Sequence, residues 1–166
     1  MFDPVRDFND NHQIANTIVQ HHDPFDCIVA VGRSGIPLAI TIHEYFNPKI
    51  PIIYANVSSY EGEKSKSIKS VGLWDNELFH KFDGKYNTSV LIVDNIIDSG
   101  KTINYITNLI EVSISKPEIQ IACKYFNNNA KLNDNIIPGK NLHCLRFKDD
   151  NDWIIQPHEK EAISGH

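Results

Sequence analysis

The stretch VLIVDNIIDSGKT (residues 90–102) holds an apolar run, two polar residues, two further apolar residues, an acid, a Ser-Gly turn and a helix start. The β-branched apolar run is typical of a strand that is buried on both faces. A glycine turn leading into a helix presents free backbone N–H groups and the positive end of the helix dipole. The stretch therefore predicts a strand, a turn and a helix that together bind an anion.

The segments around this unit repeat the alternation of strand and helix. Buried strands are predicted at 25–32, 51–57, 89–95 and 118–124, with a short strand possible at 142–147. Helices are expected at about 10–22, 37–45 and 101–112, the second with Pro37 in its first turn. This alternation predicts an α/β fold with a central, mostly parallel sheet flanked by helices. Ligands of such sheets bind outside the carboxyl ends of the strands.

Composition narrows the class of protein. The chain has 166 residues, 41% of them hydrophobic and 22% charged, which favours one soluble domain with a sizeable core. A net charge of −5 argues against a sequence-independent nucleic-acid binder. No apolar run approaches the roughly 18 residues that span a bilayer, and the polar start MFDPVRDFND is unlike a secretory signal. Three scattered cysteines indicate buried, reduced thiols, so a cytoplasmic protein is expected.

The turn at 98–102 has the chemistry of a phosphate site. Ser99 and Thr102 add hydroxyl donors, and Gly100 allows the backbone to approach an anion closely. A phosphate-loop NTPase would need a glycine five residues before Gly100, where the chain has Asn95. The turn is therefore expected to hold a monophosphate.

Four segments together resemble the type I phosphoribosyltransferases. Residues 90–102 resemble the family's signature for phosphoribosyl pyrophosphate (PRPP), in which two acids and two apolar residues precede Asp-Thr/Ser-Gly-x-Thr. AVGRSGIPLA (30–39) resembles its pyrophosphate loop, and VSSYEGEKS (57–65) resembles the entry to its flexible loop. DWIIQPHE (152–159) resembles the Trp-x-x-x-Pro-Trp/His-Glu tail of the xanthine–guanine branch.

The resemblance implies the fold and its organisation. It implies a type I phosphoribosyltransferase-like sheet with a small C-terminal hood, in one domain over residues 1–166. The core is expected at about 10–126 and the hood at about 127–166. The long polar connection after the second strand is expected to form a lid, at about 61–72, that closes over PRPP. The family also implies a homo-oligomer, a dimer or a tetramer.

The resemblance also implies which residues bind PRPP. The 5′-phosphate is assigned to Asp98, Ser99, Gly100, Lys101 and Thr102. Pyrophosphate is assigned to Arg33, Ser34 and Gly35, and the flexible loop is entered through Ser58, Ser59 and Tyr60. Asp94 and Asn95 are assigned to the ribose and to Mg²⁺, which Asp94 meets through PRPP and water. Ser34 stands where glycine is more usual, Asn95 stands where the family has an acid, and the alternative for Arg33 is a surface salt bridge.

A second set of residues is implied for the base. Asp98 is expected beside the purine N7 as a general base, and the alternative is that it only caps the following helix. Lys124 would donate to the 6-oxygen, Trp153 would stack on the ring, and the backbone of Ile154 would meet the 2-position. Ile155 leaves the choice among guanine, xanthine and hypoxanthine open.

These residues favour a purine phosphoribosyltransferase. It would transfer the phosphoribosyl group of PRPP to a 6-oxopurine with Mg²⁺, giving a nucleoside monophosphate and pyrophosphate in purine salvage. One alternative is a PRPP-binding regulator of the same fold, which Asn95 favours. Another is an enzyme with a different base acceptor, against which Lys124 and Trp153 speak. Neither a membrane nor a nucleic acid is expected as a partner.

Overall fold

A computed structural model describes residues 4–46, 48–59, 68–70 and 87–149 of the chain. Its elements are, in order, α1 (Pro4–His21), β1 (Cys27–Val31), α2 (Gly32–Tyr45), β2 (Ile52–Ala55), β3 (Val57–Ser59), β4 (Ile68–Ser70), β5 (Ser89–Ile97), α4 (Lys101–Ser113), β6 (Glu118–Asn127) and β7 (Leu142–Lys148). The strand that was possible at 142–147 is present as β7.

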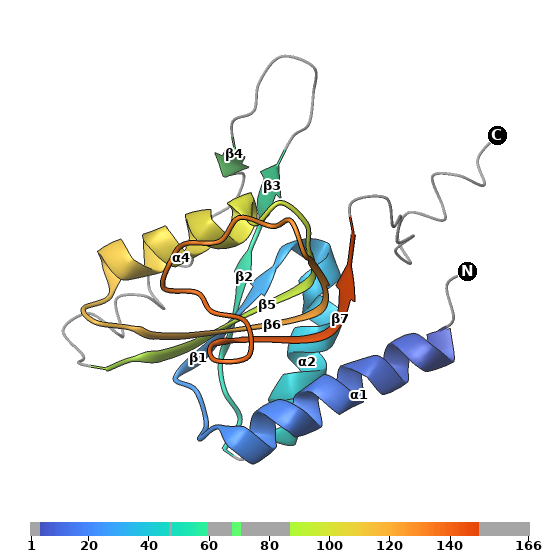
Figure 1. The fold of residues 1–166 in the computed structure, drawn as a ribbon. Helices are drawn as coiled ribbons and strands as arrows, with labels where there is room; N and C mark the ends of the chain where they lie inside the picture. Colours follow the sequence, from blue (N-terminus) through green and yellow to red (C-terminus); the bar gives the residue numbers. More distant parts are fainter. Residues whose placement is uncertain (1–3, 47, 60–67, 71–86, 150–166) are drawn as a thin grey trace.

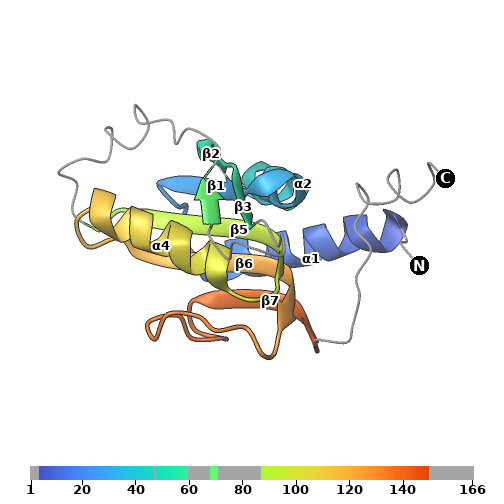
Figure 2. The ribbon, with the colours of Figure 1, turned by 90° about the horizontal axis from the view of Figure 1, so that it is seen from above.

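Five parallel strands form the centre of the molecule. Their order is β2-β1-β5-β6-β7, and β3 pairs with β4 in a separate antiparallel ribbon (Figure 1). Helices α1 and α2 lie on one side of the sheet and α4 lies on the other (Figure 2). The predicted α/β fold with a parallel sheet flanked by helices is confirmed.

Each face of the sheet has its own core. Side chains alternate along β1, so that Cys27, Val29 and Val31 pack with the residues of α4, whereas Ile28 and Ala30 pack with those of α1 and α2. All five residues of β1 are buried, which is why the sequence shows a continuous apolar run there. The cysteines are free thiols, Cys27 and Cys123 buried and Cys144 half-buried.

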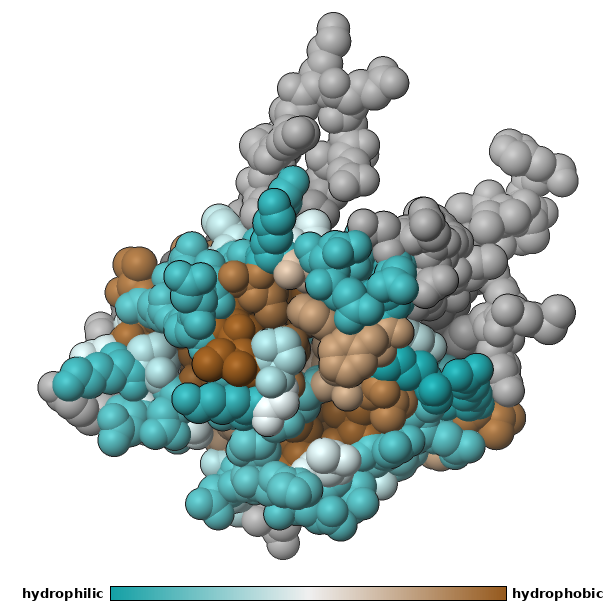
Figure 3. All heavy atoms as spheres, in the orientation of Figure 1, coloured by the Kyte–Doolittle hydropathy of each residue, from teal (hydrophilic) through white to brown (hydrophobic). Residues whose placement is uncertain are grey.

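The surface beyond these cores is mixed. The face that carries α4 and the loop after β6 shows apolar surface in its middle and hydrophilic surface around it (Figure 3). Among the described residues, no helix combines the length and the apolar character that crossing a membrane requires.

The starts of two helices differ from the sequence prediction in ways that affect the site, and β6 runs three residues beyond its predicted end at Lys124. The prediction that the second helix starts at Pro37 was wrong, because α2 already begins at Gly32 and has Pro37 inside it. A proline there removes one helical hydrogen bond, yet the turn before it is held because Gly35 packs directly on the carbonyl of Val93 in β5. Helix α1 begins at Pro4, about two turns earlier than expected, which brings Asp7 into a helix.

Candidate functional site

Three side chains meet where β5, β6 and β7 end. Asp98 lies in the turn after β5, and its Oδ1 accepts a hydrogen bond of 3.0 Å from Nδ2 of Asn127, the last residue of β6. Nζ of Lys148, the last residue of β7, lies 2.7 Å from the same oxygen. The carboxylate thus belongs to the carboxyl edge of the sheet, where ligands of such sheets bind.

The environment of Asp98 keeps it ionised. The hydrogen bond from Lys148, followed by that from Asn127, lowers the pKa of this carboxyl from its usual range. The alternative that Asp98 only caps α4 is wrong, since the N-cap is Gly100 and the cap has no side-chain hydrogen bond. Asp98 is therefore an exposed carboxylate that can accept a proton or a hydrogen bond from a ligand.

The turn after Asp98 is fixed by the loop that follows β6. Gly100 has a φ of +84°, and a Cβ there would lie 2.6 Å from the carbonyl oxygen of Lys131. The N–H of Lys131 donates to the carbonyl of Ser99 at 3.1 Å. A side chain at position 100 is excluded both by the backbone conformation and by this contact. Ser99 and Lys101 are exposed beside the first turn of α4, as a phosphate-binding turn requires.

Asp94 lies inside β5 and is buried. Its Oδ1 accepts hydrogen bonds from the N–H of Asn95 at 2.7 Å and from Oγ of Ser34 at 3.4 Å. Burial raises the pKa of this carboxyl to about 7, although these hydrogen bonds oppose the rise. Among the described residues, no lysine or arginine pairs with it. Asp94 carries a carboxylate and Asn95, the next residue of β5, carries an amide, and both are oxygen ligands of the kind that suits Mg²⁺.

The segment expected to be a pyrophosphate loop is the first turn of α2. A Cβ at Gly35 would lie 2.5 Å from the carbonyl oxygen of Val93, so only glycine allows this turn to pack on β5. Arg33 is exposed and, within the described part of the chain, makes no ion pair, so the surface salt bridge is not formed. The hydrogen bond between Ser34 and Asp94 joins this turn to the strand of the PRPP-like signature.

Lys124 has a partner that the sequence did not indicate. It lies in β6 with 4% of its surface exposed, and its Nζ forms an ion pair with Oδ1 of Asp7 in α1. A second pair, 3.0 Å between Asp10 of α1 and Arg146 of β7, lies beside it. Asp7 and Asp10 are three residues apart, so the sequence alone indicates that they share a helix face. It does not indicate their partners, which are 117 and 136 residues away.

Some predicted residues lie outside the part that the structure describes. These are Tyr60, Trp153 and Ile154, together with most of the expected lid at 61–72, of which residues 68–70 form β4. The backbone of Ser58 and Ser59 belongs to β3, where they pair with Lys69 and Ile68.

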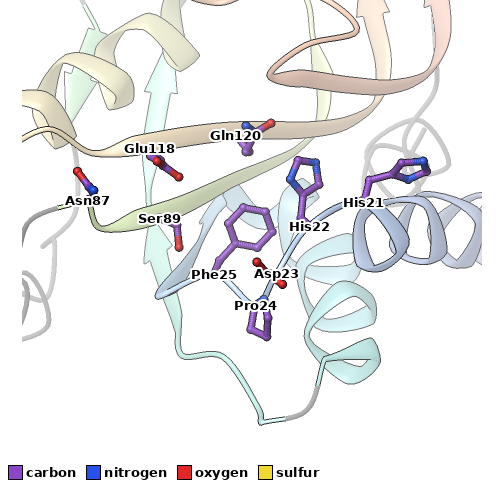
Figure 4. Close-up of a pocket in the computed structure, with 9 residues that line it drawn as sticks. All are labelled: His21, His22, Asp23, Pro24, Phe25, Asn87, Ser89, Glu118 and Gln120. Carbon is purple, nitrogen blue, oxygen red and sulfur yellow. The ribbon is translucent and has the colours of Figure 1, made fainter.

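A cavity of about 340 Å³ lies at the opposite edge of the sheet, beside the first residues of β5 and β6 (Figure 4). His22 lines it from the end of α1 and faces Gln120 of β6. Nε2 of His22 lies 3.1 Å from Nε2 of His143, and burial lowers the pKa of both imidazoles. Because ligands of parallel sheets bind at the carboxyl edge, this cavity is separate from the candidate site.

Known proteins with similar sequence patterns and structures have the same fold. The sequence pattern of the phosphoribosyl transferase domain matches residues 8–162. A purine phosphoribosyltransferase from Pyrococcus horikoshii superposes with a TM-score of 0.69 at 20% identity, over 95% of this chain and 91% of that one.

Two further solved structures have the same fold. A hypoxanthine-guanine phosphoribosyltransferase from Bacillus anthracis gives a TM-score of 0.63 at 16% identity, over 86% and 78% of the two chains. A xanthine-guanine-hypoxanthine phosphoribosyltransferase from Helicobacter pylori gives 0.60 at 14%, over 89% of each chain. A search of curated protein sequences found no match.

Proposed function

Because the chain belongs to the phosphoribosyl transferase domain family, we propose that it transfers the phosphoribosyl group of PRPP to a 6-oxopurine. The observation that carries the proposal is the geometry of residues 90–102, in which a buried strand ends in an exposed, ionised Asp98 followed by a glycine turn and a helix start. The purine acceptor is supported by Lys124, which lies three residues before the end of β6, and by the purine enzymes among the structural neighbours.

In the proposed reaction the ribose C1′ becomes cationic as pyrophosphate leaves, so catalysis rests on position and electrostatics. The turn at 98–102 binds the 5′-phosphate, the first turn of α2 with Arg33 binds pyrophosphate, and Asp94 with Asn95 binds the ribose hydroxyls. Asp98 accepts the N7 proton of the base, and Lys124 donates to the 6-oxygen with the N–H groups that Asp7 does not use.

Asp94 and Asn95 are the residues that fit Mg²⁺, reached through the oxygens of PRPP and water. These residues would hold the ion, which would supply positive charge against the charge that develops on pyrophosphate. Asp94 serves this role because it is a buried carboxylate held in place by the N–H of Asn95 and the hydroxyl of Ser34. The oligomer, the cytoplasmic location and the hood at 127–166 remain predictions from the sequence.

Pyrophosphate release tests the proposal. Protein, PRPP and Mg²⁺ are mixed in turn with guanine, xanthine, hypoxanthine, adenine and orotate, and release with the 6-oxopurines is expected. Asp98→Asn should lower turnover on the order of a hundredfold or more, the scale of a lost general base, and PRPP affinity should fall much less. PRPP binding without turnover of any base would contradict the proposal and favour a PRPP-sensing regulator.

A further inference from the structure

Two donors with little exposed surface hold one oxygen of an exposed carboxylate. The side chain of Asp98 is 68% exposed, whereas that of Lys148 is 10% exposed and Asn127 as a residue is 3% exposed. Asn127 and Lys148 are direct partners in the pairing of β6 with β7, so their side chains lie on the same face of the sheet. The donors are therefore part of the rigid sheet, while the acceptor lies in a turn.

The orientation of the amide is fixed as well. Oδ1 of Asn127 accepts a hydrogen bond of 2.9 Å from the N–H of Asn129, which leaves Nδ2 facing Asp98. Within the described part of the chain, both donors contact Oδ1 of Asp98. The second oxygen, Oδ2, is the one that remains for a ligand.

We propose that Asn127 and Lys148 are positioning residues that hold Oδ1 of Asp98 and present Oδ2 to the purine N7–H. The inference rests on the proposed function and adds two residues to it. As the lone pair of N9 forms the bond to C1′, the bond from C1′ to pyrophosphate breaks and its electron pair leaves with pyrophosphate. The proton on N7 then moves to Oδ2, while Oδ1 keeps its two donors.

Asn127 and Lys148, together called the clamp, have both an orienting and an electrostatic effect on Asp98. A surface aspartate samples several side-chain rotamers, so fixing one oxygen removes that freedom before the base binds. Of the two groups that act on Asp98, Lys148 from β7 carries a charge and Asn127 from β6 is neutral. The ammonium therefore accounts for the larger part of the lowered pKa of Asp98, and it keeps the carboxylate free of a proton until the base arrives.

The first test uses Lys148→Met, with Lys148→Arg as the conservative variant and Lys140→Met, an exposed lysine in the loop before β7, as the control. Lys148→Met should lower kcat roughly ten- to a hundredfold, with the KM for PRPP changed by less than about threefold. The acid limb of its kcat profile should move to higher pH. Lys148→Arg should recover most of the rate, and Lys140→Met should match the parent. An unchanged kcat and acid limb in Lys148→Met would overturn the inference.

A second measurement is independent of turnover. The pKa of the Asp98 carboxyl is followed by NMR in the parent and in Asn127→Leu and Lys148→Met, once circular dichroism shows that each is folded. The pKa should rise in both variants and most in Lys148→Met. If the pKa of Asp98 rises in the variants but the parent releases no pyrophosphate with any base, then Asn127 and Lys148 do act on Asp98 and the proposed function is wrong. If it stays constant in a folded Lys148→Met, the clamp itself is absent.

Discussion

Removal of the carboxylate from the pair between Asp7 and Lys124 should destabilise the fold strongly. The side chain of Lys124 is 5% exposed and that of Asp7 is 26% exposed, so the ammonium depends on this partner for most of its compensation. Loss of one partner from a buried pair costs about 3–5 kcal/mol. Asp7→Asn keeps an oxygen acceptor, and a neutral hydrogen bond recovers about 1 kcal/mol of that. The expected loss in unfolding free energy is about 2–4 kcal/mol.

The assay is urea unfolding at neutral pH, followed by circular dichroism. A loss of this size corresponds to a fall in Tm of roughly 4–16 °C for a chain of this length. The matched control is Glu44→Gln, which breaks the pair of 2.9 Å between Glu44 and Lys49, whose side chains are 62% and 50% exposed. Its unfolding midpoint should hardly change, since exposed pairs are screened by water.

A double variant separates charge from packing. Asp7→Leu combined with Lys124→Met removes both charges and leaves apolar side chains, so it should recover most of the stability that Asp7→Asn loses. A loss below about 1 kcal/mol in Asp7→Asn, equal to the control, would refute the reasoning that Lys124 depends on Asp7.

Three further predictions concern the turn, the opposite edge and the base. Gly100→Ala should destabilise by more than Gly139→Ala in urea unfolding, because both have positive φ but only a Cβ at position 100 meets a backbone carbonyl; equal losses would contradict this. Unfolding free energy should fall as pH drops below about 6.5, because the lowered pKa values of His22 and His143 mean that the unfolded chain binds protons first. The loss of unfolding free energy at low pH should be smaller in His143→Gln than in the parent. An equal loss in both proteins would show that His143 does not cause it. The kcat/KM for adenine should be about 5- to 150-fold lower than that for hypoxanthine. Adenine leaves one N–H of Lys124 without an acceptor, and an unpaired buried donor costs about 1–3 kcal/mol. Lys124→Met should reduce the difference in kcat/KM between hypoxanthine and adenine. Comparable use of the two bases by the parent would exclude the role given to Lys124.

Local pattern was enough to predict the central unit of the fold. Residues 90–102 form a strand, a turn and a helix because a β-branched run, a glycine and an amphipathic segment follow one another directly. Each of these preferences acts over a few residues, so the sequence carries it openly. The same holds for β1, whose continuous apolar run reflects burial on both faces.

The errors arose where distant contacts override local preference. Pro37 is a plausible helix start, but α2 begins five residues earlier because Gly35 fits against the carbonyl of Val93 in another strand. The partners of Asp98 were missed for the same reason. Asn127 and Lys148 are 29 and 50 residues away, and only the register of β6 with β7 brings them together.

The two lysine–carboxylate pairs near the proposed site differ in a way that separates their roles. In both pairs little of the lysine side chain is exposed, 5% for Lys124 and 10% for Lys148. The acids differ, because Asp7 is 26% exposed and belongs to a helix, whereas Asp98 is 68% exposed and belongs to a turn. An exposed carboxylate can take up a second partner at little desolvation cost, but a buried pair that opens leaves a charge uncompensated. The acid of the Asp98 pair is therefore accessible to a second partner, such as the base in the proposed reaction. The pair with Asp7 is suited to hold Lys124 in place, and the proposed reaction would use its other N–H groups.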